Sequence, residues 1–399
     1  MAAFPDREAA MYEGKILFAQ IIEHLPRKAL NNAIARHNGD YKVKDFTCRD
    51  QLLAMLFAQL TLRDGLRGIE ATLRVNGSLL YHMGFRCQTI SRNTLANANE
   101  GRPWQIWAEL AMVLMKKARA LYANQPLAID LDAKVFALDS TTIDLCLSRF
   151  PWTPSMQSKA GVKMHVLLDL HGDIPDFVVI SHGKMHDVNF LDTLTYVPGA
   201  YYVMDRGYMD FNRLYRLHQR QAFYVTRARK NLQFAVAASD SSDRAAGVIC
   251  DQTIRLIGRR TQPAYPEPLR RIKYRDPQGK TLVFLTNNFA LPALMIAALY
   301  KQRWQIELFF KWIKQHLKIK KFYGYSENAV RTQLWIAVAA YCLLAIIKKQ
   351  LGGDRDLHEI QEILSASIFR KIPLVQAFSN IPVKTDSPYL PNQPSLFEL

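Results

Sequence analysis

Paired cysteines, a long apolar run and a signal peptide are all lacking from this sequence. The five cysteines are far apart and form no CxxC pair, so neither a zinc site nor a thiol redox centre is expected. Residues 1–18 include charged side chains and lack the apolar core of a secretory signal. The longest apolar run, 334–347, has 14 residues, whereas a bilayer span needs about 20. We therefore expect a cytoplasmic protein with reduced thiols, no membrane partner and a buried helix at 334–347.

Acidic residues are also scarce relative to basic ones. The 399 residues include 52 Lys and Arg against 35 Asp and Glu, a net charge of +17, and the pI is near 9.6. Residues 206–330 alone contain 23 basic and 8 acidic side chains. Such a balance indicates a polyanionic partner such as nucleic acid. We expect this basic segment, 206–330, to face DNA.

Strand-like alternation is rare in the first third of the chain. Between residues 14 and 122, apolar residues recur at helical spacing, as in the run 52–60, so we expect a helical N-terminal domain over 1–130. Residues 65–69 predict the start of one helix, and Ser91 is the predicted N-cap of another. A DNA-binding helix-turn-helix and a plain helical bundle both remain open.

The pattern changes at Lys134, where short β-like segments begin. Helices are expected at 188–194 and 211–221, and Gly172 and Asp173 are expected to make a turn. The five expected strands are 135–139, 162–170, 174–181, 201–205 and 223–227. This order of elements is that of a ribonuclease-H-like α/β core, in which helices flank a mixed five-stranded sheet.

A β-rich insertion is expected within this core at about 231–287, before a helix resumes at 291–317. The α/β domain then covers 131–350. Residues 351–399 are expected to form a C-terminal helical segment with a loose tail, because 382–399 contain four prolines and no apolar period. The strand-like pieces of the insertion are 253–257, 271–274 and 281–285.

Two aspartates follow apolar strands at comparable positions. Asp139 precedes a polar Ser-Thr-Thr stretch, and Asp205 precedes Arg206 and Gly207. In the expected sheet the first and fourth strands are neighbours, so the two carboxylates converge on one point. Hard oxygen ligands attract magnesium, and a third carboxylate would complete a two-metal site for phosphoryl transfer.

The helix expected at 291–317 supplies that third carboxylate. Tyr300, Arg303, Glu307 and Lys314 lie within about 60° of one another at 3.6 residues per turn, with Lys311 at the border. We predict that Glu307 binds metal and that the cations hold DNA phosphates. For an isolated helix, ordinary Arg–Glu pairing on a solvated face is the favoured interpretation. Because the two strand aspartates converge on one point, we instead interpret this helix face as part of a metal site.

Other polar residues are interpreted more simply. Asp144, Asp169 and Asp187 are expected to support the site from behind or to make turns. His182 and His186 flank a short loop, but no third nitrogen or sulfur ligand follows at zinc-like spacing. We expect these two histidines to form hydrogen bonds within that loop.

Three motifs together resemble the DDE transposases of insertion-sequence family four. They are Asp139-Ser140-Thr141, Asp205-Arg206-Gly207 and the Y-x2-R-x3-E-x6-K pattern that begins at Tyr300. The resemblance runs from roughly Phe46 to Phe378 and includes the stretches 91–99 and 159–165. It implies a ribonuclease-H-like catalytic domain with a β-rich insertion, and cut-and-paste movement of DNA.

The resemblance also implies how the site works. Asp139, Asp205 and Glu307 would hold two Mg²⁺ ions, which Mn²⁺ can replace, for strand cleavage and strand transfer without a covalent protein intermediate. Members of the family act as homodimers on paired transposon ends. The implied partners are double-stranded terminal inverted repeats, bound in part by the N-terminal domain, and target DNA in the bacterial nucleoid.

Phosphate contacts follow from the same resemblance. The family assigns them to Tyr300, Arg303 and Lys314, and we add Lys311 and Arg206 as DNA-binding residues.

Similar transposases cleave through a hairpin on the transposon end and stack a flipped base on an aromatic side chain. Trp304, Trp312 and Tyr265 are candidates for that stack, which stays unassigned.

Two other functions remain open. A ribonuclease-H-like, structure-specific nuclease would use the same carboxylates but only hydrolyse DNA. A non-catalytic DNA-binding protein derived from a transposase would keep the acidic residues for structure alone. Strand joining by a 3′-hydroxyl separates the first alternative from a transposase, and the three matched carboxylates argue against the second.

Overall fold

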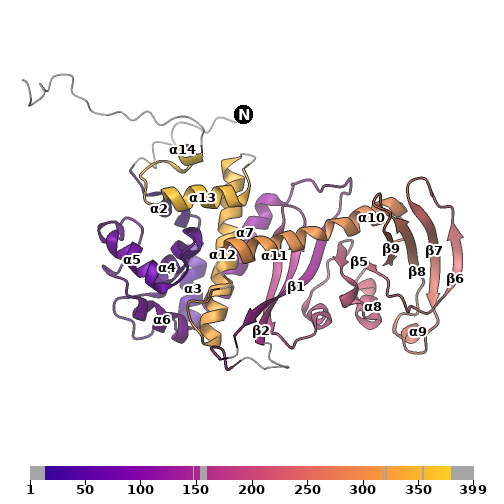
Figure 1. Cartoon of the computed structure of the whole chain (residues 1–399), viewed down its shortest axis with the longest axis horizontal. Helices are drawn as coiled ribbons and strands as arrows, with labels where there is room; N and C mark the ends of the chain where they lie inside the picture. The colour runs from indigo at the N-terminus through magenta and orange to yellow at the C-terminus, as the bar shows by residue number, and fades with distance from the viewer. Residues whose placement is uncertain are drawn as a thin grey trace, which may run out of the picture.

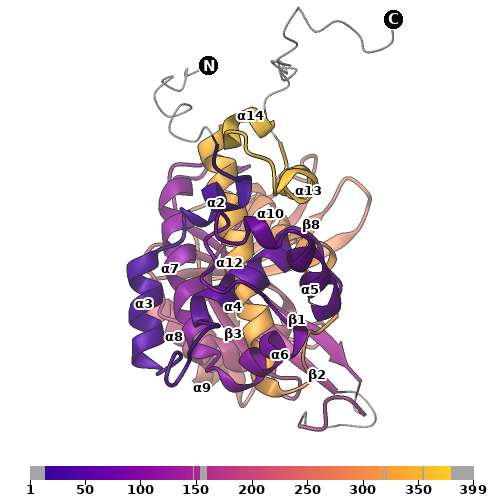
Figure 2. The ribbon, with the colours of Figure 1, turned by 90° about the vertical axis from the view of Figure 1, so that its left-hand side faces the viewer.

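The computed structural model describes residues 14–146, 148–152, 160–317, 319, 321–352 and 355–378; the tail predicted at 382–399 lies outside these ranges. Within the described residues, six α-helices precede the first strand and gather at one end of the molecule (Figures 1 and 2). They are α2 (Leu17–Ile22), α3 (Arg27–Arg36), α4 (Cys48–Leu60), α5 (Leu66–Val75), α6 (Arg92–Gly101) and α7 (Gln105–Tyr122), with the short 3₁₀ helix η1 (Gly77–Leu79) after α5.

Capping residues account for where two of these helices begin. Thr47 accepts the backbone N–H of Asp50, whose carboxylate accepts the N–H of Thr47 in return, so a capping box starts α4. Ser91 accepts the N–H of Thr94 at the start of α6, which confirms the predicted N-cap. The link between α5 and α6 covers 76–91, far more than the three to four residues, roughly, of a helix-turn-helix. The length of this link therefore favours a plain helical bundle over a helix-turn-helix.

A mixed sheet follows, and its nine strands in the described chain have the order β3-β2-β1-β4-β5-β9-β8-β7-β6. β1 pairs antiparallel with β2 and parallel with β4, and β4 pairs parallel with β5. The strands are β1 (Val135–Leu145), β2 (Ala160–Asp169), β3 (Ile174–His182), β4 (Tyr201–Met204), β5 (Phe223–Arg227), β6 (Phe234–Asp240), β7 (Val248–Leu256), β8 (Leu269–Arg275) and β9 (Thr281–Thr286).

The predicted mixed sheet flanked by helices is confirmed, but it extends further than predicted. β1 to β5 lie at the five predicted positions, and the insertion contributes β6 to β9. Because β9 pairs antiparallel with β5, the insertion strands continue the same sheet instead of forming a separate unit. The sheet therefore has nine strands where five were predicted. β6 was not predicted at all.

The first strand is longer than predicted. β1 pairs with β2 as far as Leu145, whereas its pairing with β4 ends at Leu138. Asp139 therefore lies within a strand, at the point where the neighbouring strand stops, and the prediction that the strand ends at Asp139 was wrong. The segment expected as a helix at 188–194 is also different, because it forms the 3₁₀ helix η2 (Asp187–Thr193).

Helices cover both faces of the sheet. The helices α7, α10 (Ala293–Gln302), α11 (Trp304–His316) and α12 (Glu327–Leu351) pack on one face, and η2, α8 (Phe211–Gln219) and α9 (Thr261–Ala264) on the other. α10 and α11 cross the front of the sheet one after the other (Figure 1). The single helix predicted over 291–317 is interrupted at Arg303, which separates the two.

The predicted buried helix at 334–347 lies within α12, and every residue of that run is buried. By length and composition alone α12 could cross a membrane, but 94% of its most apolar window is buried inside the fold. It packs against α4, α6, α7, β3 and α13 (Leu357–Ser367), and α14 (Leu374–Phe378) follows. α12 is therefore the central core helix that joins the N-terminal helices to the sheet.

Candidate active site

The two strand aspartates lie side by side in the sheet. Leu138 and Met204 are partners in the parallel pair of β1 and β4, so Asp139 is the next residue on β1 and Asp205 directly follows the end of β4. The backbone N–H of Ser140 donates to Oδ1 of Asp139 at 2.8 Å. Oδ1 of Asp205 accepts the N–H of Gly207 and caps the 3₁₀ helix η3 (Arg206–Tyr208). Both carboxylates are thus oriented by backbone donors.

An arginine connects the helix carboxylate to this pair. Arg303 lies between α10 and α11, and its Nη1 is 3.5 Å from Oδ2 of Asp139. Its Nη2 donates to Oε1 of Glu307 at 2.5 Å. The structure thus brings Glu307, from α11, to the same arginine as Asp139, from β1.

The charges at this point are dominated by the carboxylates. Burial, aided by the negative charges of Asp205 and Glu307, raises the pKa of Asp139 to about 6, although the Ser140 N–H and Arg303 act to lower it. Asp139 therefore experiences the charges of both other carboxylates. A concentration of hard oxygen donors under excess negative charge fits a divalent cation.

Arg303 currently supplies the positive charge there. Within the described ranges, no three His, Cys, Asp or Glu side chains are grouped closely enough to enclose a metal ion. The guanidinium separates Asp139 from Glu307, and its side chain is only 15% exposed. The carboxylate oxygens thus suit a cation. For them to surround a metal ion, Arg303 must release Asp139, Glu307 or both.

The other residues of the helix motif lie along the same side of the sheet. Tyr300 packs on Phe284 of β9, with ring centroids 5.0 Å apart, and the Arg303 guanidinium lies 5.8 Å from the centre of the Tyr300 ring. Nζ of Lys314 donates to the carbonyl of Thr142 on β1 at 3.1 Å. Within the stripe predicted from helical spacing, Arg303 and Lys314 therefore contact β1, whereas Tyr300 packs against β9.

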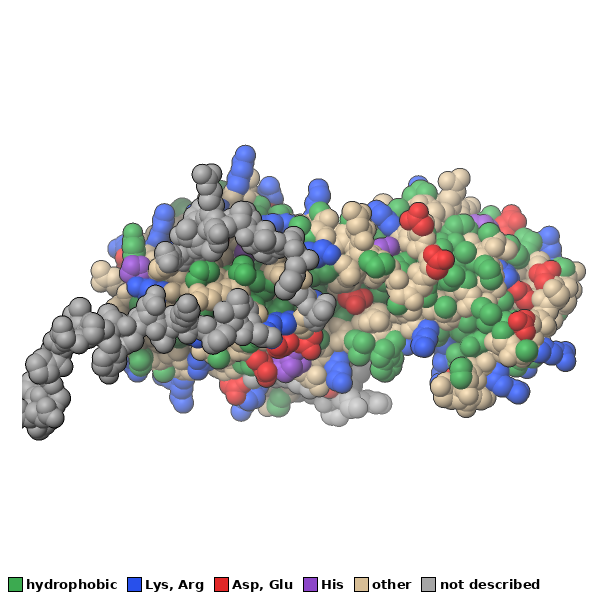
Figure 3. All heavy atoms as spheres, turned by 90° about the horizontal axis from the view of Figure 1, so that it is seen from above, with side chains coloured by type: hydrophobic (Ala, Val, Ile, Leu, Met, Phe, Trp, Pro, Cys, Tyr) green, Lys and Arg blue, Asp and Glu red, His purple; other side chains and the backbone are tan. Residues whose placement is uncertain are grey.

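Two predicted DNA-binding residues are on the surface. Arg206 and Lys311 are exposed, so both can reach a ligand outside the protein. Seen from above, Lys and Arg side chains lie along both margins of the molecule, and acidic side chains are scattered between them (Figure 3).

Arg227 is a residue of this site that the sequence analysis missed. Val203 pairs with Val225 in the parallel pair of β4 and β5, so Arg227 continues the row of Asp139 and Asp205 on the next strand. Its charge acts on Tyr300, whose pKa is raised by burial and lowered by Arg303 and Arg227. The signal available in the sequence was its position at the end of the fifth strand, equivalent to that of the aspartates.

The aromatic candidates differ in exposure. Trp304 is 56% exposed and, with Tyr300 and Tyr274, lines a hollow of about 560 Å³ beside α10. Trp312 packs edge-on against Tyr341. Tyr265 is 1% exposed and hydrogen-bonded to His218. Among the three, only Trp304 is largely exposed, and it lines the same hollow as Arg303.

The remaining polar candidates are dispersed. Asp144 is exposed near the end of β1, and Asp169 pairs with Arg119 and His171 at the end of β2. His182 lies 4.0 Å from Glu327. His186 precedes η2 and does not join His182 in any metal-like cluster of described residues.

Asp187 is the one member of this group that contacts the site. It accepts hydrogen bonds from Ser140 and Lys163.

A basic chain with a mixed sheet and carboxylates linked by one arginine is the arrangement expected of enzymes that cut and join nucleic acid strands. Within that class, the chain belongs to the family defined by the transposase DDE domain, whose family model matches residues 130–343. A second model, described as a domain of unknown function (DUF4372), matches residues 13–86. The protein is thus a DDE transposase of the insertion-sequence type.

Curated relatives agree with this assignment. A protein of Sinorhizobium fredii named as a transposase is 38% identical over 256 residues, covering 63% of this chain and 70% of the relative. The transposase named for insertion sequence IS5377 of Geobacillus stearothermophilus is 31% identical over 63% of this chain and 66% of its own length. A transposase named for insertion sequence element IS4SA of Synechocystis is 26% identical over 69% of this chain and 78% of its own length.

A solved structure, the piggyBac transposase synaptic complex with hairpin DNA, aligns over 92% of this chain and 81% of its own. At a TM-score of 0.45 and 10% identity, that likeness is too distant to bear on function. Membership of the DDE family, in contrast, implies dependence on a divalent metal ion.

Proposed function

We propose that Asp139, Asp205 and Glu307 are the catalytic carboxylates of a cut-and-paste transposase, and that they hold two Mg²⁺ ions, which Mn²⁺ can replace. The observation that carries this proposal is the link through Arg303, which contacts Asp139 on β1 and Glu307 on α11. Asp205 adjoins Asp139 in the sheet register. When bound, divalent ions activate water or a 3′-hydroxyl and stabilise the departing 3′-oxygen.

The proposed scaffold for these carboxylates is a ribonuclease-H-like core made of β1 to β5. The order β3-β2-β1-β4-β5, with β1 parallel to β4 and β4 parallel to β5, supports it. Under this proposal residues 131–350 form the catalytic domain, with its insertion at about 231–287. Residues 351–399 then form the C-terminal segment.

The cationic side chains around the carboxylates have a positioning role in this proposal. Arg303, Lys314 and Arg227 lie beside the site, and Lys311 and Arg206 are exposed near it. Each presents N–H donors to phosphate oxygens, and the planar guanidinium groups can do so with two parallel bonds. Fixing the backbone on both sides of the scissile phosphate places that phosphate against the carboxylates.

The phenol of Tyr300 also belongs to this phosphate-binding group. Its ring is held between Phe284 and Arg303, so its hydroxyl has a fixed direction. A hydroxyl oriented in this way donates a hydrogen bond to one phosphate oxygen at low entropic cost.

Terminal inverted repeats and target DNA are the proposed partners, with the helices of residues 1–130 as the end-binding region. We propose a homodimer on paired ends, acting in the cytoplasm at the nucleoid. The net charge of +17 supports a DNA partner through counterion release.

The test uses isosteric variants and a duplex that carries the inverted repeat flanking the gene. Asp139→Asn, Asp205→Asn and Glu307→Gln should each abolish cleavage while DNA binding, followed by fluorescence anisotropy, stays within about twofold of wild type. Asp144→Asn, on the exposed side of the same strand, is the matched control and should cleave normally. Normal cleavage by any of the three site variants would refute the assignment.

Strand transfer decides between the proposed function and its first alternative. A transposase joins the released 3′-hydroxyl end to target DNA, whereas a hydrolytic nuclease stops after cleavage. Wild-type protein incubated with pre-cleaved ends and supercoiled plasmid should yield joined products, and the three site variants should yield none. Absence of joined products with the wild type would favour the nuclease.

A further inference from the structure

A network of polar side chains lies on the opposite face of β1 from Asp139. Successive residues of a strand point to opposite faces, so Ser140 projects away from the carboxylate site. Its hydroxyl donates to Oδ1 of Asp187, at the start of η2, at 2.6 Å. Nζ of Lys163, on the neighbouring β2, donates to the same Oδ1 at 3.0 Å and to the carbonyl of Met185 at 2.9 Å. Asp187 thus joins three segments that are distant in sequence.

This network acts on the peptide unit next to Asp139. The backbone N–H of Ser140 donates to Oδ1 of Asp139 at 2.8 Å, while its hydroxyl is held by Asp187. One residue is therefore hydrogen-bonded through its backbone to the carboxylate on the front face and through its side chain to an anchor on the back face. Rotation of this peptide would break both contacts together.

Lys163 serves this anchor and not the DNA surface. Its side chain is 17% exposed, and its ammonium is directed at Asp187 and a carbonyl group. Burial would raise the pKa of Asp187, but the hydrogen bonds from Ser140 and Lys163 and the charges of Lys163 and His165 outweigh it, so the pKa lies below the ordinary value. Asp187 is consequently ionised, and a charged acceptor holds a hydroxyl more firmly than a neutral one.

On the side of β2, Asp187 lies next to a buried histidine. His165 is fully buried, 4.0 Å from Asp187, and stacks on Phe190 of η2 with ring centroids 5.3 Å apart. Its Nε2 hydrogen-bonds to Ser181 on β3 at 2.9 Å. Because the partners of Asp187 are themselves fixed, the anchor has little freedom to follow a displaced Ser140.

We infer that Asp187, oriented by Lys163, is a positioning residue for Asp139 and acts through Ser140. This inference rests on the proposed function, in which Asp139 binds metal. Groups that hydrogen-bond behind a metal ligand fix its orientation, and their loss costs about 10- to 100-fold in metal affinity or activity. The network thereby sets how readily Asp139 accepts a divalent ion.

The test measures Mn²⁺ binding to the full chain by the electron paramagnetic resonance signal of free Mn²⁺, without DNA. Ser140→Ala and Asp187→Asn should raise the dissociation constant about tenfold or more. Ser140→Thr, which restores the hydroxyl, should return it to within about twofold of wild type. Ser239→Ala and Asp240→Asn, on the exposed edge strand β6, are matched controls and should bind as wild type.

Three outcomes are informative. Weaker binding by Ser140→Ala with recovery in Ser140→Thr supports the inference, because a general loss of stability would not follow the hydroxyl group. Wild-type affinity in Ser140→Ala overturns it, provided that Asp139→Asn weakens binding, and this result leaves the proposed function intact. Wild-type affinity in Asp139→Asn overturns both. Since Ser140→Ala removes only one oxygen, the test survives a failure of Asp187→Asn to fold.

Discussion

The guanidinium of Arg303 lies 3.5 Å from the carboxylate of Asp139, joining the junction of two helices to the middle of a strand. The same guanidinium holds Glu307 through its other terminal nitrogen. A divalent ion at these carboxylates would need the oxygen atoms that Arg303 contacts. Guanidinium and metal ion are therefore competitors for one set of acceptors.

This competition predicts how Arg303→Met responds to metal. Without added ions the variant should have a lower melting temperature than the wild type, because two carboxylates lose their counter-charge. Added Mn²⁺ should raise its melting temperature by more than it raises that of the wild type, since the ion no longer displaces an arginine. Differential scanning fluorimetry with and without Mn²⁺ measures both effects.

Arg331→Met is the matched control for that experiment. Arg331 is also 15% exposed and pairs with a glutamate four positions away, Glu327, but lies on α12. Its loss should lower the melting temperature without changing the response to Mn²⁺. An equal Mn²⁺ response in the two variants would contradict the competition.

The basic segment 206–330 predicts a steep salt dependence of DNA binding. Each phosphate contact that is lost should reduce the slope of log K against log salt by about 0.9. The double variant Arg206→Gln/Lys311→Gln should therefore bind a duplex with a slope smaller by about two. Lys371→Gln, exposed and outside the segment, should leave the slope unchanged. A double variant with the wild-type slope would exclude these two residues from the phosphate contacts.

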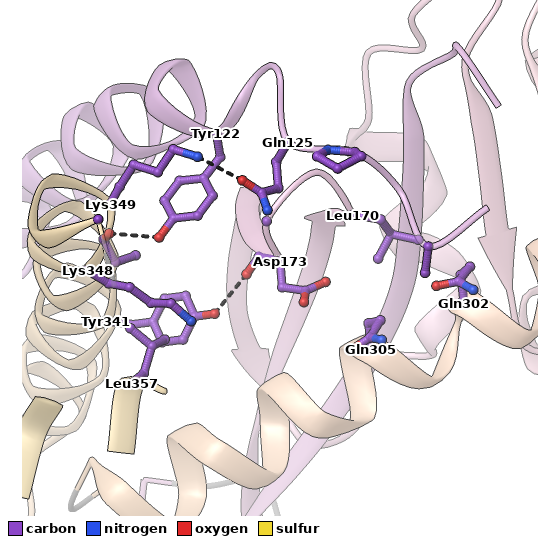
Figure 4. Close-up of a pocket in the computed structure, with 15 residues that line it drawn as sticks. Tyr122, Gln125, Leu170, Asp173, Gln302, Gln305, Tyr341, Lys348, Lys349 and Leu357 are labelled. Atoms are coloured by element: carbon purple, nitrogen blue, oxygen red, sulfur yellow. Dashed lines mark hydrogen bonds between the residues drawn. The ribbon is translucent and has the colours of Figure 1, made fainter. Parts of the chain in front are cut away.

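A polar hollow of about 760 Å³ between α7, the β2–β3 turn and α12 contains an unusual carboxylate (Figure 4). The turn places both Gly172 and Asp173 at positive φ, and the carbonyl of Asp173 accepts the Tyr341 hydroxyl at 2.8 Å. The Oδ1 atom of Asp173 has no hydrogen-bond partner among the described residues. Burial, aided by the charge of Asp169, raises the pKa of Asp173 to about 6, although the charge of Lys348 acts to lower it.

The raised pKa of Asp173 therefore predicts that the folded chain loses stability as the pH rises and this carboxyl group ionises. Its pKa in the folded chain lies above the ordinary 3.8, so folded protein holds the proton more tightly than unfolded protein between about pH 4 and 6. The cost of the charge is absent below about pH 4 and complete above about pH 6. Since one pKa unit corresponds to about 1.4 kcal/mol, that cost is at most about 3 kcal/mol.

Asp173→Asn removes the charge and keeps a residue type that tolerates positive φ. Its melting temperature relative to wild type should be higher at about pH 8 than at about pH 4. Asp240→Asn, on exposed β6, should show no such difference between the two pH values. A constant offset for Asp173→Asn at both pH values would rule out the effect.

Much of the sheet could be predicted because its strands are short apolar runs bounded by polar residues. β5 was predicted at its observed bounds, 223–227, and β4 within one residue. β6 was missed because its sequence is dominated by small residues, and all but its first residue are exposed. β1 was cut short at Asp139 because the following Ser-Thr-Thr resembles a turn, although pairing with β2 holds it in the strand.

The site was only partly accessible to sequence reasoning. Helical spacing placed Arg303 and Glu307 on one face, which the structure shows, but no glycine or proline marks the interruption at Arg303. Arg227 was assigned no role at the site, and Asp187 was not distinguished from Asp144 and Asp169, because their proximity to Asp139 depends on strand register and on loop packing. Neither is encoded in local spacing.

α12 ties the helices of the N-terminal third to the sheet. It is apolar on all sides, and α4, α6 and α7 cover one part of it while β3 and α13 cover others. One continuous hydrophobic core therefore spans the point near residue 130 where the sequence changes character. A chain cut there would leave α12 half uncovered and prone to aggregate. The N-terminal helices and the sheet thus cannot be exchanged as independent modules between such chains without refitting this helix.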